Sequence, residues 1–112
     1  MSIAGDLIRG HTDAIILARL LRGDSYGYEI NKTISNISSG RFELKEATLY
    51  TAFKRLEEAG FIASYWGDSG AGARRRYYTI TAVGRDAHHH LMLEWQETKE
   101  IMEKLLRMED EQ

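Results

Sequence analysis

The stretch from residue 45 to residue 80 reads KEATLYTAFKRLEEAGFIASYWGDSGAGARRRYYTI, and it decides the fold. Its first part predicts a helix from about Lys45 or Glu46 to Ala59, which Gly60 can end. Four apolar residues recur on one face of this helix, namely Leu49, Ala52, Phe53 and Leu56. The period then changes, and residues 61–66 and 75–80 predict the two strands of a hairpin around a glycine-rich turn, 67–72.

The residues before this stretch predict two shorter helices. Thr12 can cap the first of them, and Gly23 can end it. Asp24 or Ser25 can cap the second helix, which Gly40 stops.

After the hairpin, Thr81 can cap a long helix over about residues 82–108, with a length of about 40 Å. Three short helices, a hairpin and a long terminal helix are the elements of a winged helix-turn-helix. The predicted fold class is therefore mainly α (α+β).

Composition excludes several classes of function. The chain has 112 residues and no cysteine, which excludes disulfides, thiolate metal sites and cysteine nucleophiles. It contains no nucleophile elbow, phosphate-binding loop, HExxH motif or convincing carboxylate pair, so we expect neither an enzyme nor a cofactor. No apolar run reaches membrane-spanning length and residues 1–10 lack the apolar core of a signal peptide. We therefore expect a cytoplasmic protein with no membrane partner.

Three consecutive histidines, His88 to His90, raise the question of a metal site. Consecutive side chains on a helix point about 100° apart, so the three cannot converge on one ion. We expect no metal site here.

Charge is distributed unevenly along the chain. The formal net charge is −2, but residues 94–112 hold seven acidic and three basic side chains, so the remaining 93 residues carry +2. Arg74, Arg75, Arg76 and Arg85 follow one another with no acidic residue between them. Because nucleic acid responds to the local field, the overall charge does not exclude it as a partner.

The helix expected over residues 45–59 has a polar outer face. On a helical wheel, the side opposite Leu49 carries Ala47, Thr51, Lys54 and Glu58, and the flanks carry Thr48, Tyr50 and Arg55. Hydroxyl and cationic groups on such a face can bind phosphates and base edges in the major groove. The alternative interpretation is an ordinary solvated helix face.

The expected hairpin is basic at its second strand. Arg74 and Arg76 should share one face while Arg75 takes the other. An arginine pair at the end of a hairpin can straddle the phosphate backbone or enter a narrow minor groove. The alternative is an edge strand protected by charge. Together, the polar-faced helix and the basic hairpin favour DNA binding.

Four segments of the chain form a specific combination of motifs. They are GDSYGYEI at 23–30, ELKEATLY at 43–50 with KRLE at 54–57, SYWGD at 64–68, and RRRYY at 74–78 followed by Ile80, Thr81 and Gly84. Together they resemble the PadR family of bacterial transcriptional regulators. The match extends from about residue 10 to residue 95. The resemblance implies a homodimeric winged-helix repressor of the compact branch, with a single C-terminal helix.

In that family the third helix enters the major groove and the tyrosine-rich start of the second helix contacts the DNA backbone. Carried over to this chain, the resemblance points to Ser25, Tyr26, Tyr28, Lys45, Thr48, Tyr50, Thr51 and Lys54, and in the wing to Gly72, Arg74, Arg75 and Arg76. Many relatives have proline after the tyrosine of the third helix. This chain has Thr51 there, as members of the multidrug-sensing branch do, so contacts inferred from proline-bearing relatives do not transfer.

The long terminal helix carries an apolar stripe with heptad-like spacing. The stripe consists of Leu91, Trp95, Thr98, Met102 and Leu105, widened by Ile101. A second subunit is its expected partner, and the alternative is packing on its own domain. We therefore assign residues 1–81 to a DNA-binding domain and 82–112 to a C-terminal dimerisation helix, and expect a palindromic operator.

A small aromatic effector is a further expected partner. In the multidrug-sensing branch a tryptophan lines a hydrophobic pore at the dimer centre, and Trp95 aligns with it. Ala14, Leu17 and Ala18 should face the same space, with Lys99 as a weaker candidate. The alternative is that Trp95 is only a core anchor. A ligand there would release the repressor from its operator, whereas an adaptor that binds another protein through the long helix is the alternative function.

Overall fold

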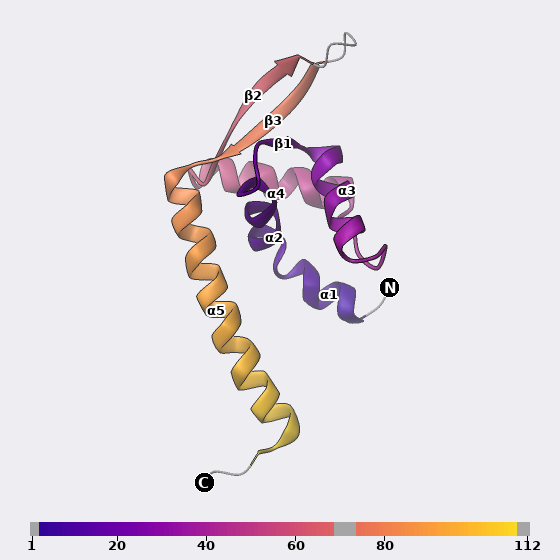
Figure 1. Ribbon diagram of the computed structural model, residues 1–112, viewed down its shortest axis with the longest axis vertical. Helices are drawn as coiled ribbons and strands as arrows, with labels where there is room; N and C mark the ends of the chain where they lie inside the picture. The colour runs from indigo at the N-terminus through magenta and orange to yellow at the C-terminus, as the bar shows by residue number, and fades with distance from the viewer. Residues whose placement is uncertain (1–2, 69–73, 110–112) are drawn as a thin grey trace.

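The molecule consists of a helical head, a projecting hairpin and a long helical arm (Figure 1). The computed structural model describes residues 3–68 and 74–109, and its longest dimension is 63 Å. The elements are, in order, α1 (Ile3–Arg9), α2 (Thr12–Leu20), β1 (Ser25–Tyr26), α3 (Gly27–Ile37), α4 (Glu46–Glu58), β2 (Ile62–Asp68), β3 (Arg74–Ile80) and α5 (Ala82–Arg107). This mainly α fold with a small antiparallel sheet confirms the expected class.

The core lies where α2, α3 and α4 meet the base of the hairpin. Helix α4 buries the four residues expected from its periodicity, Leu49, Ala52, Phe53 and Leu56. The Phe53 ring stacks on Tyr78 of β3 with centroids 4.0 Å apart. Apolar residues of α2 and α3 complete the core, among them Ile16, Leu17, Leu20 and Ile30. These contacts pack α4 and the hairpin of β2 and β3 together as one unit.

The sheet has three strands rather than the two expected. Ser25 pairs with Tyr78 and Tyr26 with Tyr77, which gives the strand order β1-β3-β2. The expectation that Asp24 or Ser25 caps a helix is therefore wrong, because α3 begins at Gly27 with Tyr26 at its N-cap. The backbone of residues 25 and 26 pairs with β3, and a strand this short leaves no periodic signal in the sequence.

The N-terminal segment also differs from expectation. Residues 3–9 form the helix α1, which the sequence did not predict. Thr12 does not cap α2 but is its first residue, since His11 holds the N-cap position and the Thr12 hydroxyl donates to the carbonyl of Arg9 at 2.7 Å. Thr12 thus ties α2 back to the end of α1.

Helix α5 begins at the base of the hairpin and leaves the head. Its expected cap is confirmed, since Thr81 Oγ1 accepts a hydrogen bond from the Gly84 amide at 3.0 Å. Gly84 packs so tightly that an added Cβ would lie 2.0 Å from the Phe61 carbonyl oxygen. Ala87 and Leu91 pack against the core, and the helix then continues into solvent. None of the helices among residues 3–68 and 74–109 has the length and apolar character that crossing a bilayer requires.

Candidate nucleic-acid interface

Helix α4 presents the predicted polar residues to solvent. Lys45 lies at its N-cap, and Thr51 and Lys54 are exposed on the face opposite the core. Tyr50 is 48% exposed, and Thr48 is partly buried on the flank. The structure therefore brings the hydroxyl and ammonium groups expected from the helical wheel together on one accessible surface.

Two contacts from other helices hold α4 in position. The Asn31 side chain of α3 donates to the Leu44 carbonyl at 2.7 Å and accepts from the Leu44 amide at 2.8 Å, just before α4 begins. Arg55 of α4 donates to both carboxylate oxygens of Asp13 in α2. This hydrogen bond raises the pKa of the Arg55 guanidinium, so Arg55 stays charged.

Tyr50 is fixed against the start of α3. A Cβ added at Gly27 would lie 2.8 Å from the Tyr50 hydroxyl oxygen, so a larger residue at position 27 would require the Tyr50 ring to shift. Tyr50 also packs edge-on against Phe53, with centroids 5.5 Å apart. On the same side of α4, burial raises the pKa of Tyr78, which therefore remains a neutral phenol at the base of the hairpin.

The wing, defined here as β2 and β3, carries its arginines on the two predicted faces. Arg74 and Arg76 lie on the face toward α4, where the Arg74 guanidinium stands 5.3 Å from the Trp66 ring centroid and Arg76 forms a 3.4 Å ion pair with Glu57. Arg75 lies on the opposite face and donates to the Tyr26 hydroxyl at 2.9 Å. The predicted site residue Gly72 lies outside the described residues.

The start of α3 contributes only part of what was expected. Tyr28 is 71% exposed, and Tyr26 is partly buried beneath Arg75. Ser25 is completely buried and donates to Glu29 Oε1 at 2.6 Å. The expectation that the Ser25 side chain contacts DNA is corrected for this reason: pairing of β1 with β3 turns it into the core.

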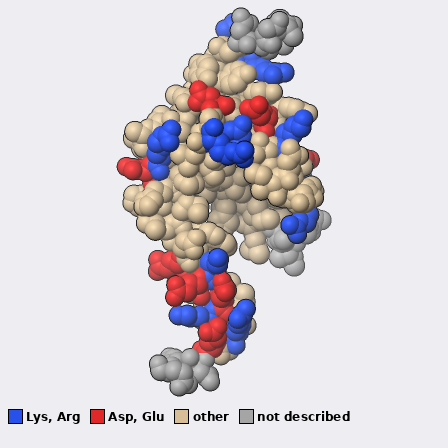
Figure 2. Space-filling view, viewed as in Figure 1, with Lys and Arg blue, Asp and Glu red and all other residues tan. Residues whose placement is uncertain are grey.

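The balance of charged side chains differs between the head and the arm. Figure 2 shows basic side chains with some acidic ones over the hairpin and head, and acidic side chains crowded among basic ones along the far half of α5. This distribution follows the sequence, in which residues 94–112 have four more acidic than basic side chains and residues 1–93 have two more basic than acidic ones. On formal charge, the arm is therefore the less favourable part of the molecule for a polyanion, and the head is the more favourable one.

A recess of about 860 Å³ opens between the head and α5 (Figure 2). Ala14 and Ala18 of α2 and Trp95 of α5 line it as expected, and the Trp95 ring contacts His11 edge-on at 5.2 Å. Leu17 does not line it, because its side chain is fully buried in the core. Lys99 also lies outside it and borders a separate shallow hollow on α5.

Beyond the head, the apolar stripe of α5 is open to solvent. Leu91 is partly buried, while Thr98 is exposed and four apolar side chains are 41–56% exposed, namely Trp95, Ile101, Met102 and Leu105. The stripe thus has no cover within the described part of the chain.

The histidine run lies on the same helix, where His90 Nδ1 is 2.9 Å from the Asp86 carbonyl oxygen. Among the described residues, no three His, Cys, Asp or Glu side chains converge as metal ligands.

Comparison with known proteins identifies the family. The sequence pattern of the transcriptional regulator PadR-like family matches residues 16–90. The chain belongs to this family. A PadR family transcription regulator from Clostridium difficile is similar to this PadR-like chain, with 37% identity, a TM-score of 0.74 and coverage of 86% of this chain and 98% of that one. A transcriptional regulator from Clostridium thermocellum is 46% identical, with a TM-score of 0.84 and coverage of 92% and 97%.

A further similar structure contains nucleic acid. It is Bacillus subtilis PadR in complex with operator DNA, which is 25% identical, with a TM-score of 0.64, and covers 71% of this chain and 45% of that one. PadR-like proteins are transcriptional regulators and not enzymes, as the sequence predicted.

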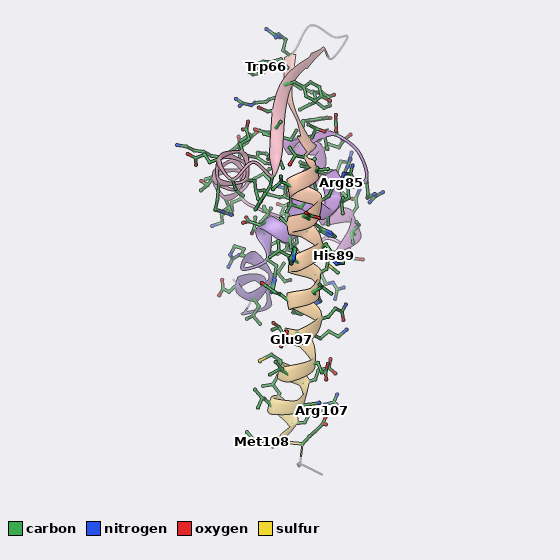
Figure 3. All side chains as sticks on the ribbon, turned by 90° about the vertical axis from the view of Figure 1, so that its left-hand side faces the viewer. Trp66, Arg85, His89, Glu97, Arg107 and Met108 are labelled. Carbon is green, nitrogen blue, oxygen red and sulfur yellow. The ribbon has the colours of Figure 1, made fainter. Side chains whose placement is uncertain are left out.

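The structure also identifies residues that the sequence analysis did not single out. Asn31 and Asp13 position α4, and Glu57 joins α4 to the wing by accepting from both Ser64 and Arg76. Trp66, 57% exposed, lies on the wing beside Arg74 (Figure 3). The roles of Asp13 and Glu57 have no signal in the sequence, because they depend on which basic side chain the fold places beside each carboxylate.

Proposed function

We propose that this PadR-like protein is a homodimeric repressor that binds a palindromic operator and is released from it by a small aromatic or hydrophobic ligand. The observation that carries this proposal is the exposed face of α4. Thr51 and Lys54 lie there with Tyr50 beside them, and the wing arginines border the same surface. A helix of this width fits the major groove, and the flanking cations can bind phosphates.

The exposed stripe of α5 supports a homodimer. Side chains such as Ile101 and Leu105 lie about half exposed on a helix that has left its own core. A second copy of the helix would bury both stripes at once, because a twofold interface uses the same surface twice. Two heads on one face of DNA then require half-sites about one helical turn apart. We assign the stripe to this use rather than to an adaptor function.

The recess beside Trp95 supports a ligand site. It lies between α2 of the head and α5, the helix that would join the two subunits. A ligand that binds better to one arrangement of head and arm shifts the population toward that arrangement. Trp95, 41% exposed at the wall of the recess, offers a flat ring for stacking.

The test of DNA binding uses a labelled duplex that carries the promoter preceding the protein's own gene. We expect two chains per duplex and an affinity that falls steeply with salt. Lys54→Ala should weaken binding about tenfold at constant dimer content. Lys104→Ala, on the exposed far part of α5, is the matched control and should bind as wild type does. A protein that binds no DNA but captures another protein through α5 would support the adaptor instead.

The ligand proposal has its own test. The chain has two tryptophans, so a Trp66→Phe variant reports from Trp95 alone. Titration with a hydroxycinnamic acid and with a planar aromatic cation should quench this fluorescence and release the duplex. Unchanged fluorescence with both compounds, at concentrations that release DNA, would place the ligand elsewhere.

A further inference from the structure

Another hollow borders α4 on the side away from the wing. Six residues of α1, α2 and α4 line it, namely Arg9, Thr12, Ala47, Thr48, Thr51 and Arg55. On α4, Thr48, Thr51 and Arg55 are spaced three and four residues apart and therefore share this flank. The wing borders the opposite flank, where Tyr50 and Lys54 face Arg76. Helix α4 thus has a cationic border on each side.

Arg55 is held in a defined orientation at this hollow. Its Nε and Nη2 atoms donate to the two oxygens of Asp13, yet the Arg55 side chain remains 53% exposed. A guanidinium has five N–H donors, and within the described residues Arg55 uses only Nε and Nη2. The Nη1 hydrogens are therefore left for another acceptor, on a side chain whose entropy is already reduced by Asp13.

Other donors complete the lining. Arg9 is 28% exposed and pairs with Asp6 through Nη2. The hydroxyl of Thr51 is on the exposed outer face of α4. Two guanidinium groups and a hydroxyl around one concave surface are the donors that a phosphodiester group accepts from.

We propose that this hollow binds a backbone phosphate of the operator, with Arg55 as the principal donor and Arg9 and Thr51 beside it. The site rests on the proposed function of DNA binding. A helix in the major groove has one phosphate strand on each side of it. The wing binds the phosphates of one strand, and this hollow binds a phosphate of the other strand. Asp13 holds Arg55 at the hollow through two hydrogen bonds. Asp13→Asn keeps one side-chain oxygen that can accept from Arg55, so this substitution chiefly removes the negative charge beside the phosphate.

The competing explanation is that the Arg55 pair only joins α2 to α4. An ion pair between side chains 53% and 36% exposed contributes little to stability, because water and salt screen it. The two explanations also differ in what they predict for Asp13. If Asp13 and Arg55 form only a structural pair, removing the Asp13 carboxylate should change the DNA affinity as removing the Arg55 guanidinium does. If Asp13 lies beside a bound phosphate, removing its negative charge should relieve a repulsion.

The experiment measures affinity for the labelled promoter duplex and for an unrelated duplex of equal length, over a range of salt concentrations. Arg55→Gln should weaken binding to both duplexes by about fivefold to tenfold and reduce the salt slope by about 0.9 for each phosphate that the variant no longer binds. Asp13→Asn should bind both duplexes at least as tightly as wild type. Arg107→Gln, at the far end of α5 (Figure 3), is the matched control and should change neither value.

The outcomes separate the two proposals. Wild-type protein that binds neither duplex would overturn the proposed function and this site with it. If wild type binds while Arg55→Gln binds equally well, only the phosphate site is wrong. If Asp13→Asn weakens binding as Arg55→Gln does, the pair is structural and the site is again wrong. Circular dichroism during thermal unfolding shows whether each variant is folded. Arg55→Lys, which keeps the positive charge, should bind the duplexes more tightly than Arg55→Gln.

Discussion

A single carboxylate, Asp24, joins the loop before β1 to the wing. Tyr65 of β2 donates its hydroxyl to Asp24 Oδ2 at 2.7 Å. This hydrogen bond, followed by one from Thr79, lowers the pKa of Asp24 below its ordinary value of 3.8. The same bond raises the pKa of Tyr65, because the carboxylate stabilises the protonated phenol. The wing is therefore attached to the head by a contact that depends on ionisation.

The sign of the resulting pH dependence follows from the lowered pKa. The ionised form of Asp24 is favoured in the folded state, so its contribution to stability is complete above about pH 4 and is lost as the pH falls through the folded pKa. We expect Asp24→Asn to remove this component from the stability measured by urea unfolding between pH 6 and pH 2. Tyr65→Phe should have a similar effect. If the free energy of unfolding falls equally between pH 6 and pH 2 in wild type and in both variants, Asp24 does not have this role.

Residues of α4 and Ser25 differ in how far the sequence could predict them. The exposure of Thr51 and Lys54 depends on helical period, which neighbouring residues determine, and it was predicted correctly. Ser25 was predicted to face DNA, but its burial depends on pairing with Tyr78, which is far away in the sequence. Local pattern cannot supply such a contact. The hydrogen bond from Arg55 to Asp13 likewise joins two residues that are far apart in the sequence, so local pattern cannot predict it.

Among the elements, α3 positions α4 through the two hydrogen bonds between Asn31 and the backbone of Leu44. The loop between these helices has no regular structure from residue 42 to residue 45. Phe42 and Leu44 are buried in it, so their backbone groups need partners inside the protein. Asn31 supplies both an acceptor and a donor to Leu44, which fixes the entry of the chain into α4.

We expect Asn31→Ala to lower the free energy of unfolding by about 1–3 kcal/mol, because it leaves the buried amide and carbonyl of Leu44 without partners. Urea unfolding measures this decrease, and DNA affinity should fall with it as α4 loses its fixed start. Asn36→Ala, at an exposed position of the same helix, controls for helix propensity. Equal stability of the two variants would mean that water replaces the Asn31 hydrogen bonds.

The longer elements could be predicted from sequence, and the shortest could not. Helix α4, the hairpin and α5 have strong periodicity, and Gly60 and Thr81 mark their ends as expected. Strand β1 has two residues, and α1 has seven with Leu7 69% exposed, so neither leaves a clear amphipathic pattern. Their positions are set by tertiary contacts.

At the scale of the whole molecule, the arm has a surface that residues 3–68 and 74–109 leave uncovered. Helix α5 spans 26 residues, and beyond its first turns the apolar side chains of the stripe lie in solvent. Contiguous apolar surface of this kind marks an interaction site. Pairing of two arms would convert this exposed stripe into the interface that holds two heads at one spacing.

We expect Leu105→Glu to shift the protein from dimer to monomer, because it places an unpaired carboxylate within the apolar stripe that the two subunits would bury. Analytical ultracentrifugation measures the mass, and the DNA affinity should drop because each head then binds alone. Gln96→Glu introduces the same charge on the opposite side of α5 and should remain dimeric. A dimer unaffected by Leu105→Glu would show that another surface joins the subunits.

The way α5 starts has a mechanical consequence. Gly84 is seated against the Phe61 carbonyl and Thr81 closes the first turn, so the arm and the wing meet at one stiff joint. Trp95 lies 13 residues beyond Ala82, or about 20 Å along the helix, and the seven residues of β3 span about 23 Å on the other side. Because β3 packs on α4 through Tyr78 and Phe53, the wing moves with the head and not with the arm. A tilt of the arm by about 5° about this joint would therefore move Trp95 by about 2 Å relative to the head and the wing.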